Sequence, residues 1–222
     1  MSAIAGWAAG FLGRADAILR GRAGEAAPLQ LARQALVWGA LYGAVMGTFS
    51  GLARGRLLQI VHSALKVPLL FLSTLLLCLP VFCVLNTLRG LRRDLQAALR
   101  ALLLGQATLA IVLCSCAPLT AVVYLSTDDY QAALLWNGAL FALSALCGQV
   151  VVSAAYRPLV RRDPRHRLML GVWLALYMGV AIQLAWVLRP YVGAPGAPVE
   201  LFRAASWGNA YLVILRLLLG AR

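Results

Sequence analysis

Long apolar segments that are almost free of charge are the feature that most restricts how this chain can fold. Of its 222 residues, 62% are hydrophobic and 12% are charged, whereas an average soluble domain is about 25% charged. Five segments are long enough to cross a hydrocarbon core of about 30 Å as helices: residues 34–53, 67–88, 101–125, 131–156 and 168–188. We therefore predict a polytopic membrane protein rather than a soluble, disordered or collagen-like chain.

Amphipathic segments flank these spans at both ends of the chain. In residues 1–22, apolar side chains recur at spacings of three and four, at Ile4, Trp7, Phe11, Ala15 and Ile18. Such a helix is expected to lie in the headgroup plane. A second interfacial helix is predicted over residues 211–219, because this apolar run is too short to cross a bilayer and contains Arg216.

The predicted fold is an all-α bundle of five transmembrane helices with amphipathic interfacial helices at both ends. An N-terminal helix and turn occupy residues 1–30, the five-helix domain occupies residues 31–190, and a Pro/Gly loop with a short helix occupies residues 191–222. Residues 57–65 are expected to lie in the membrane interface and to lead into the second span.

Positive charge is distributed unevenly about the predicted spans. Basic residues outnumber acidic ones by 20 to 7, and Lys66 is the single lysine. Thirteen basic residues fall on the side that holds the N-terminus, and seven fall on the other side. Because positive charge concentrates in cytoplasmic segments, we predict a cytoplasmic N-terminus and an external C-terminus. The arginines are expected to contact anionic lipid headgroups, and no binding of nucleic acid is expected.

A glycine repeat marks one face of the first predicted span. Gly39, Gly43, Gly47 and Gly51 recur every four residues, which leaves a groove where another backbone can approach closely. The pattern favours tight helix packing within one subunit. An oligomer interface around a pore is the alternative.

Three prolines are predicted to kink the second and third spans. Pro68 opens the second span, Pro80 lies inside it, and Pro118 lies inside the third. Each proline removes a backbone donor and frees the carbonyl four residues earlier. At Pro118 that carbonyl belongs to Cys114, which is followed by Ser115 and Cys116. This cluster lacks histidine and carboxylate partners, so it does not favour a metal or cofactor site.

Polar side chains in and beside the spans are few. Lys66, Arg157 and Arg189 stand near prolines at span ends, where we expect contact with lipid headgroups or a partner. Neutral amides inside the spans are expected to form hydrogen bonds between helices; they are Asn86, Gln106, Asn137, Gln149 and Gln183. The absence of a carboxylate from the spans argues against a proton- or sodium-coupled transporter.

The pattern of histidines, carboxylates and cysteines predicts neither catalysis nor cofactor binding. His62 lies in the interfacial run and His166 in a basic loop; both are interpreted as interfacial side chains, with ligation of haem or a pigment as the less favoured alternative. Asp128 and Asp129 form a turn that is expected to be solvated. Five cysteines within spans are expected to be reduced packing residues. We therefore expect no catalytic residue, metal or cofactor.

Two strings resemble a known but functionally unassigned family. They are SALKVPLLFLSTLLLCLPVFCVLNTLRG, from Ser63 to Gly90, and QLAWVLRPYVGAPGAPVELFR, from Gln183 to Arg203. The chain is similar over residues 55–215 to bacterial multi-pass membrane proteins that are often labelled actin-binding WH2 domain proteins. The resemblance implies a common helical bundle in the bacterial inner membrane, without an activity. Five spans with the N-terminus inside also resemble the topology of the Yip1 superfamily.

These observations favour a non-enzymatic inner-membrane scaffold or accessory subunit of a larger complex. Its expected partners are the bilayer, other membrane subunits or a second copy of the chain. The alternative is an oligomeric channel or transporter assembled through the glycine face, with Pro80 and Pro118 along its path. A membrane-embedded enzyme ranks third, because the histidines and carboxylates are not expected to converge.

Overall fold

The computed structural model describes residues 2–19, 26–49, 57–189, 191–193 and 199. Within these residues all regular secondary structure is helical, which confirms the predicted all-α class. The elements in chain order are α1 (Ser2–Leu19), α2 (Pro28–Met46), α3 (Leu57–Leu88), the short 3-10 helix η2 (Arg92–Asp94), α4 (Leu95–Ser115), α5 (Ala117–Ser126), α6 (Tyr130–Arg162) and α7 (Arg165–Val187).

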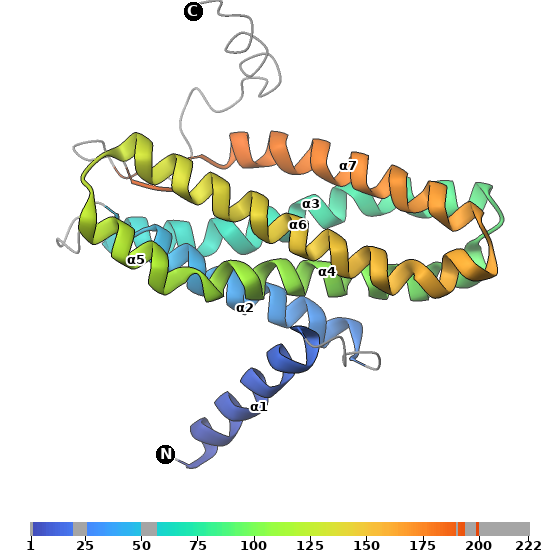
Figure 1. Cartoon of the computed structure of the whole chain (residues 1–222), viewed down its shortest axis with the longest axis horizontal. Helices are drawn as coiled ribbons and strands as arrows, with labels where there is room; N and C mark the ends of the chain where they lie inside the picture. The colour runs from blue at the N-terminus through green and yellow to red at the C-terminus, as the bar shows by residue number, and fades with distance from the viewer. Residues whose placement is uncertain (1, 20–25, 50–56, 190, 194–198, 200–222) are drawn as a thin grey trace, which may run out of the picture.

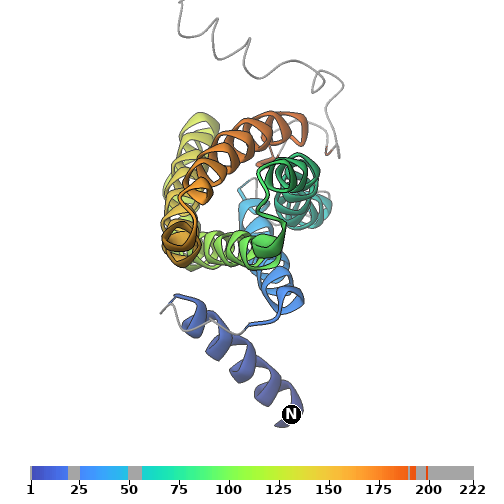
Figure 2. The ribbon, with the colours of Figure 1, turned by 90° about the vertical axis from the view of Figure 1, so that its right-hand side faces the viewer.

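The long helices run side by side along one axis. Figure 1 shows α3, α4 followed by α5, α6 and α7 in an antiparallel arrangement. Short connections between α5 and α6 and between α6 and α7 enforce the reversals of direction. Seen from the end in Figure 2, these helices surround the long axis, and α1 points away from them. Helix α2 packs against α3 and α4.

Four segments are long and apolar enough to cross a membrane, which is compatible with an integral membrane protein. They are Leu57–Leu88, Arg92–Ser126, Tyr130–Arg162 and Arg165–Val187. The predicted count of five spans is not confirmed, because α2 is absent from this set. Helix α2 has 19 residues and includes Gln30, Arg33 and Gln34, whose polar side chains lower its mean hydropathy.

Several helix boundaries differ from the sequence prediction. The first predicted span, 34–53, corresponds to a helix that begins earlier and ends at Met46, where the Gly47 N–H closes the last turn on the Gly43 carbonyl. Residues 57–65, expected in the membrane interface, form the first turns of α3 and continue directly into the second predicted span. Helix α6 continues through Pro158 to Arg162 rather than ending before this proline.

The third predicted span is interrupted at Cys116. Helix α4 ends at Ser115, and α5 begins at Ala117 with Pro118 in its first turn. Proline is tolerated there because the first N–H groups of a helix have no intrahelical partner. Arg92–Ser126 nevertheless counts as one candidate span.

The amphipathic α1 packs on the protein through the face predicted from sequence. Phe11, Ala15 and Ile18 are buried, and the latter two share a hydrophobic cluster with residues of α2 and α4. The Gln34 side chain of α2 donates a hydrogen bond to the Phe11 carbonyl over 3.3 Å. This face therefore contacts α2 and α4, and an interfacial location for α1 is not confirmed.

Two glycines bring α4 and α6 into direct backbone contact. A Cβ atom at Gly148 would lie 2.8 Å from the carbonyl oxygen of Gly105, and one at Gly105 would lie 3.1 Å from the carbonyl oxygen of Gly148. Gly138 lies on the same helix α6, but a Cβ there meets no atom within 4 Å. The approach of α4 to α6 therefore requires glycine at positions 105 and 148 and not at position 138.

This contrast predicts opposite effects for two identical substitutions in α6. Gly148→Ala is expected to lower the free energy of unfolding by about 2 kcal/mol, because its methyl group meets backbone that cannot yield. Gly138→Ala is expected to be neutral or to raise it by up to about 1 kcal/mol, because alanine favours the helix. Denaturant unfolding of the two variants in the same detergent micelles measures both changes in the free energy of unfolding. Equal effects of the two substitutions would contradict this packing.

Candidate functional site

The predicted glycine face of α2 packs against α3 of the same chain. A Cβ at Gly43 would lie 2.9 Å from the carbonyl carbon of Ser63, and one at Gly47 would lie 2.6 Å from the Cα of Ile60. At Gly39 a Cβ would lie 3.1 Å from the ring of Phe71. Gly51 lies outside the described residues. Since α3 occupies this face, a second copy would reach these glycines only by displacing α3.

The three prolines are dispersed over the bundle. Pro68 is buried in α3, close to the contact with α2. Pro80 is exposed on the same helix, and Pro118 is exposed in the first turn of α5. Neither Pro80 nor Pro118 lines the interior cavity described below. The structure therefore does not bring these two residues together along an internal path.

Lys66 differs from the expectation of a side chain that extends to the headgroups. It is 1% exposed. It lies on the same face of α3 as Gln59 and Ser63, which are also fully buried. Because these positions follow a spacing of four and three residues, they form one polar stripe on the inward side of the helix. Lys66 is therefore an interior residue of the bundle.

The segment after α7 covers part of this stripe. The Ser63 hydroxyl donates a hydrogen bond of 2.5 Å to the carbonyl oxygen of Tyr191. The Gln59 amide donates to the same oxygen over 3.2 Å. Val192 is fully buried in the cluster that also contains Tyr42 and Phe71. The polar groups of α3 thus anchor the chain that leaves α7.

The two predicted end arginines occupy different environments. Arg157 is exposed on α6, near the end where the α6–α7 connection begins. The Arg189 guanidinium lies 3.2 Å from the ring centroid of Trp186 and donates a hydrogen bond to the Trp186 carbonyl over 3.0 Å. This stacking orients the Arg189 side chain along its own segment.

His166 is an interior residue, contrary to the prediction of an interfacial side chain in a basic loop. It is fully buried, and its Nε2 lies 3.2 Å from a carboxylate oxygen of Asp94. Arg162 lies 3.9 Å from the other oxygen of this carboxylate. The imidazole also meets the ring of Tyr156 edge to face, with centroids 6.2 Å apart. His166 thereby joins the α3–α4 connection to the α6–α7 connection.

His62 and His166 do not lie together, because His62 is near the start of α3 and His166 is in the first turn of α7. The Nδ1 of His62 is buried without a hydrogen-bond partner in the described part of the chain. Among the described residues, no group of three histidines, cysteines or carboxylates could hold a metal ion. The five cysteines are free thiols.

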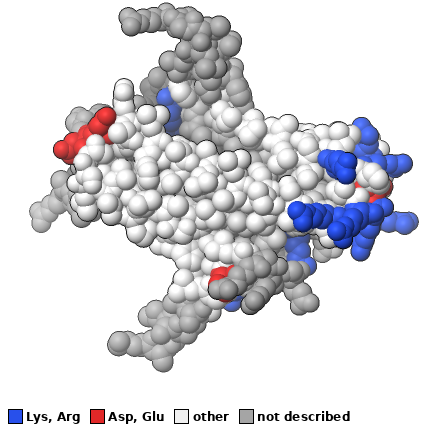
Figure 3. Space-filling model, viewed as in Figure 1, with Lys and Arg blue, Asp and Glu red and all other residues white. Residues whose placement is uncertain are grey.

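Positive charge gathers at one end of the bundle. Figure 3 shows arginines clustered at this end, with a small acidic patch among them, and a separate acidic patch at the opposite end. The basic end combines exposed arginines of the α3–α4 and α6–α7 regions: Arg89, Arg92, Arg93, Arg157, Arg161, Arg162, Arg165 and Arg167. At the other end, exposed Asp129 caps α6 by accepting a 2.8 Å hydrogen bond from the Gln131 N–H.

A buried polar network joins α2, α5 and α6. The Tyr42 hydroxyl donates a 2.8 Å hydrogen bond to the side-chain oxygen of Asn137, and the Asn137 amide donates to the Tyr124 hydroxyl over 2.6 Å. Trp136 donates to the Thr120 hydroxyl over 3.2 Å. Asn137 can be found from the sequence, because it is a neutral amide within an apolar segment. The aromatic and hydroxyl partners come from helices that are distant in sequence.

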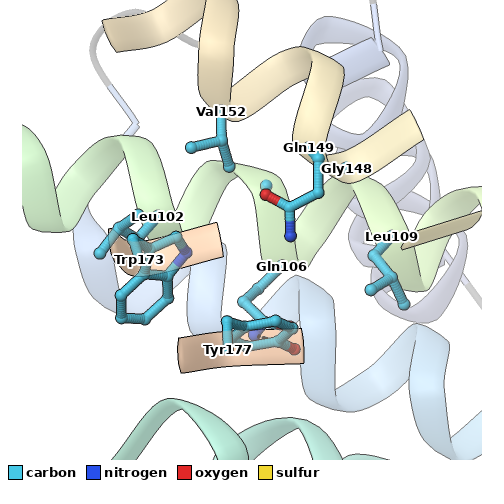
Figure 4. Close-up of a pocket in the computed structure, with 9 residues that line it drawn as sticks. Leu102, Gln106, Leu109, Gly148, Gln149, Val152, Trp173 and Tyr177 are labelled. Atoms are coloured by element: carbon cyan, nitrogen blue, oxygen red, sulfur yellow. Dashed lines mark hydrogen bonds between the residues drawn. The ribbon is translucent and has the colours of Figure 1, made fainter. Parts of the chain in front are cut away.

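A small cavity lies where α4, α6 and α7 meet, and Figure 4 shows its lining. The centre of a water-sized sphere can occupy about 10 Å³ in it. Gln106 from α4, Gln149 from α6 and Tyr177 from α7 contribute its polar atoms. The Gln106 amide donates a 2.5 Å hydrogen bond to the Tyr177 hydroxyl. The remaining lining residues are Leu102, Gly105, Leu109, Gly148, Val152 and Trp173.

Comparison with models of known protein families, with curated proteins and with solved structures found no match to this chain.

Proposed function

We propose that this protein is an integral membrane scaffold or accessory subunit without an enzymatic role of its own. The observation that carries the proposal is the contrast between its interior and its outer faces. The interior is closed by contacts within one chain, at Gly43 and Gly47 against α3 and at Gly148 against α4. The outer faces of the helices are apolar and extensive.

Among the four candidate spans, the two last helices have the smallest buried share. Of the most apolar stretch of α6, 22% is buried within the chain, and of that of α7, 17% is buried. Leu135, Leu146 and Val150 on α6 are each at least 65% exposed, and Met178 on α7 is 62% exposed. In a bilayer such faces contact lipid tails or the helices of another subunit. A bundle of this kind offers surfaces for assembly.

The alternative of a channel assembled through the glycine face receives less support. That face is occupied by α3. Pro80 and Pro118 lie on exposed positions, and neither lines the small cavity between α4, α6 and α7. The cavity between α4, α6 and α7 has room for about one water molecule. We therefore favour the scaffold or accessory role.

The proposal includes an orientation and a location. The basic end, with its eight exposed arginines, is placed at the cytoplasmic side, where it contacts anionic headgroups. The acidic connection between α5 and α6 is then external. With α2 as a fifth span, the N-terminus is assigned to the cytoplasm, the C-terminus to the outside, and the membrane to the bacterial inner membrane. We also propose that the chain belongs to the bacterial multi-pass membrane family that it resembles in the strings from Ser63 to Gly90 and from Gln183 to Arg203.

Extraction in native lipid nanodiscs tests the assembly directly. We expect particles heavier than one 23.8 kDa chain with its lipids, and unrelated membrane proteins that co-purify in fixed ratio. The control is an unrelated membrane protein that carries the same affinity tag. A chain that is recovered alone would overturn the proposal. A homo-oligomer that conducts ions or solutes across liposomes would instead support a channel.

A further inference from the structure

Two buried oxygen atoms at the junction of α4, α6 and α7 have no hydrogen-bond donor among the described residues. They are the Oε1 atoms of Gln106 and Gln149. Both residues line the small cavity, and Gln106 is 6% exposed. Figure 4 shows the Gln149 amide extending from α6 toward Gln106 of α4 and the ring of Tyr177 of α7. A buried carbonyl without a donor is destabilising, so the site needs a donor from elsewhere.

The proton of the Tyr177 hydroxyl needs a hydrogen-bond acceptor. The hydroxyl oxygen accepts the hydrogen bond from the Gln106 amide, but a phenol also carries one proton to donate. Figure 4 draws the Gln149 amide nitrogen on the side of Gln106, so this amide can donate as well. The cavity therefore presents two acceptor oxygens without a donor and two donor groups, on three different helices.

We propose that this cavity binds one water molecule that bridges α4, α6 and α7. Water can donate to the Oε1 atoms of Gln106 and Gln149 and accept from the Tyr177 hydroxyl, which gives about the three hydrogen bonds that buried waters make. The space of about 10 Å³ for the centre of a water-sized sphere matches one water molecule. The lining carries no charged side chain, so the site selects a neutral dipolar molecule over an ion.

This water lies beside a close backbone contact between two helices. Gly105 and Gly148 bring α4 and α6 into backbone contact beside the cavity, and Trp173 of α7 forms its wall. The neighbouring glycines leave no side chain that could fill the gap or satisfy the two amides. A water molecule supplies these hydrogen bonds without a change in the sequence of the three helices.

Radiolytic labelling in lipid nanodiscs tests the proposal, because hydroxyl radicals formed from a bound water modify the side chains that touch it. We expect Tyr177 and Trp173 to be labelled despite their burial. The double variant Gln106→Met with Gln149→Met keeps the side-chain length and removes both amides. We expect it to lower the labelling of Tyr177 at least several-fold.

A matched control uses another buried glutamine. Gln34 is 2% exposed, and its amide is bonded at both ends, to Trp38 and to the Phe11 carbonyl. Gln34→Met is expected to leave the labelling of Tyr177 unchanged. Equal labelling of Tyr177 in the unaltered protein and the double variant would overturn the proposal.

A second measurement does not depend on whether the double variant folds. A cryo-electron density map of the unaltered protein, at a resolution that shows other ordered waters, is expected to contain a peak between Gln106 and Gln149. An empty cavity in such a map would overturn the proposal, as would direct contact between the two amides. If the nanodisc experiment recovers the chain alone, the scaffold proposal fails, but the water peak in the map is still expected. The scaffold proposal and the water proposal can therefore fail separately.

Discussion

Gly43→Ala is expected to lower the free energy of unfolding by about 3 kcal/mol, at the upper end of the usual range for overpacking. The added methyl group would fall against the backbone of Ser63 and 3.0 Å from the Cα of Ala64. These are backbone atoms of α3, so no side chain can rotate away to make room. The helices α2 and α3 must separate, and this breaks the contact that packs α2 on the bundle. Equilibrium unfolding in detergent micelles measures the effect.

The control for this prediction is a glycine in open space. Gly171 lies on α7, and a Cβ there meets no atom within 4 Å. Gly171→Ala is expected to change the free energy of unfolding by less than about 1 kcal/mol. A Gly43→Ala protein that is as stable as Gly171→Ala would show that α2 and α3 do not approach as described.

Asn137→Leu is expected to lower the free energy of unfolding by about 2 kcal/mol, because it removes the residue shared by the hydrogen bonds of the buried Tyr42 and the partly buried Tyr124. The hydroxyl of Tyr42 would lose its 2.8 Å acceptor, and the hydroxyl of Tyr124 would lose its 2.6 Å donor. Their other polar neighbours, the Thr120 hydroxyl and the Met46 carbonyl, lie 3.4 and 3.5 Å away. Leucine fills a similar volume, so the effect reports hydrogen bonding. Unfolding by denaturant in micelles provides the measurement.

Asn86 is the matched control for Asn137. It is fully buried, its amide donates to the Phe82 carbonyl of its own helix over 2.8 Å, and its side-chain oxygen has no hydrogen-bond partner among the described residues. Asn86→Leu removes no side-chain hydrogen bond between described helices and is expected to be neutral or stabilising. If both substitutions destabilise equally, the network around Asn137 does not hold α2, α5 and α6 together.

The helical class and the four long apolar segments follow from the sequence, because a bilayer requires each spanning segment to satisfy its own backbone hydrogen bonds. Apolar length is a local property, so it can be seen without knowing any neighbour. The glycine spacing of α2 is local in the same way and marks a face that admits close approach. The identity of the helix on that face is not local, and Ser63 and Ile60 of α3 became its partners only through folding.

The differences from the sequence prediction concern polar side chains that are buried in the assembled bundle. The sequence predicts Lys66 and His166 at the membrane surface, and both are buried within the chain. His166 is buried against Asp94, 72 residues earlier, and Ser63 bonds the Tyr191 carbonyl, 128 residues later. The apolar pattern decides which segments leave water. Whether a polar residue within them is buried depends on which group folding brings within hydrogen-bond distance, and that is a property of the assembled bundle.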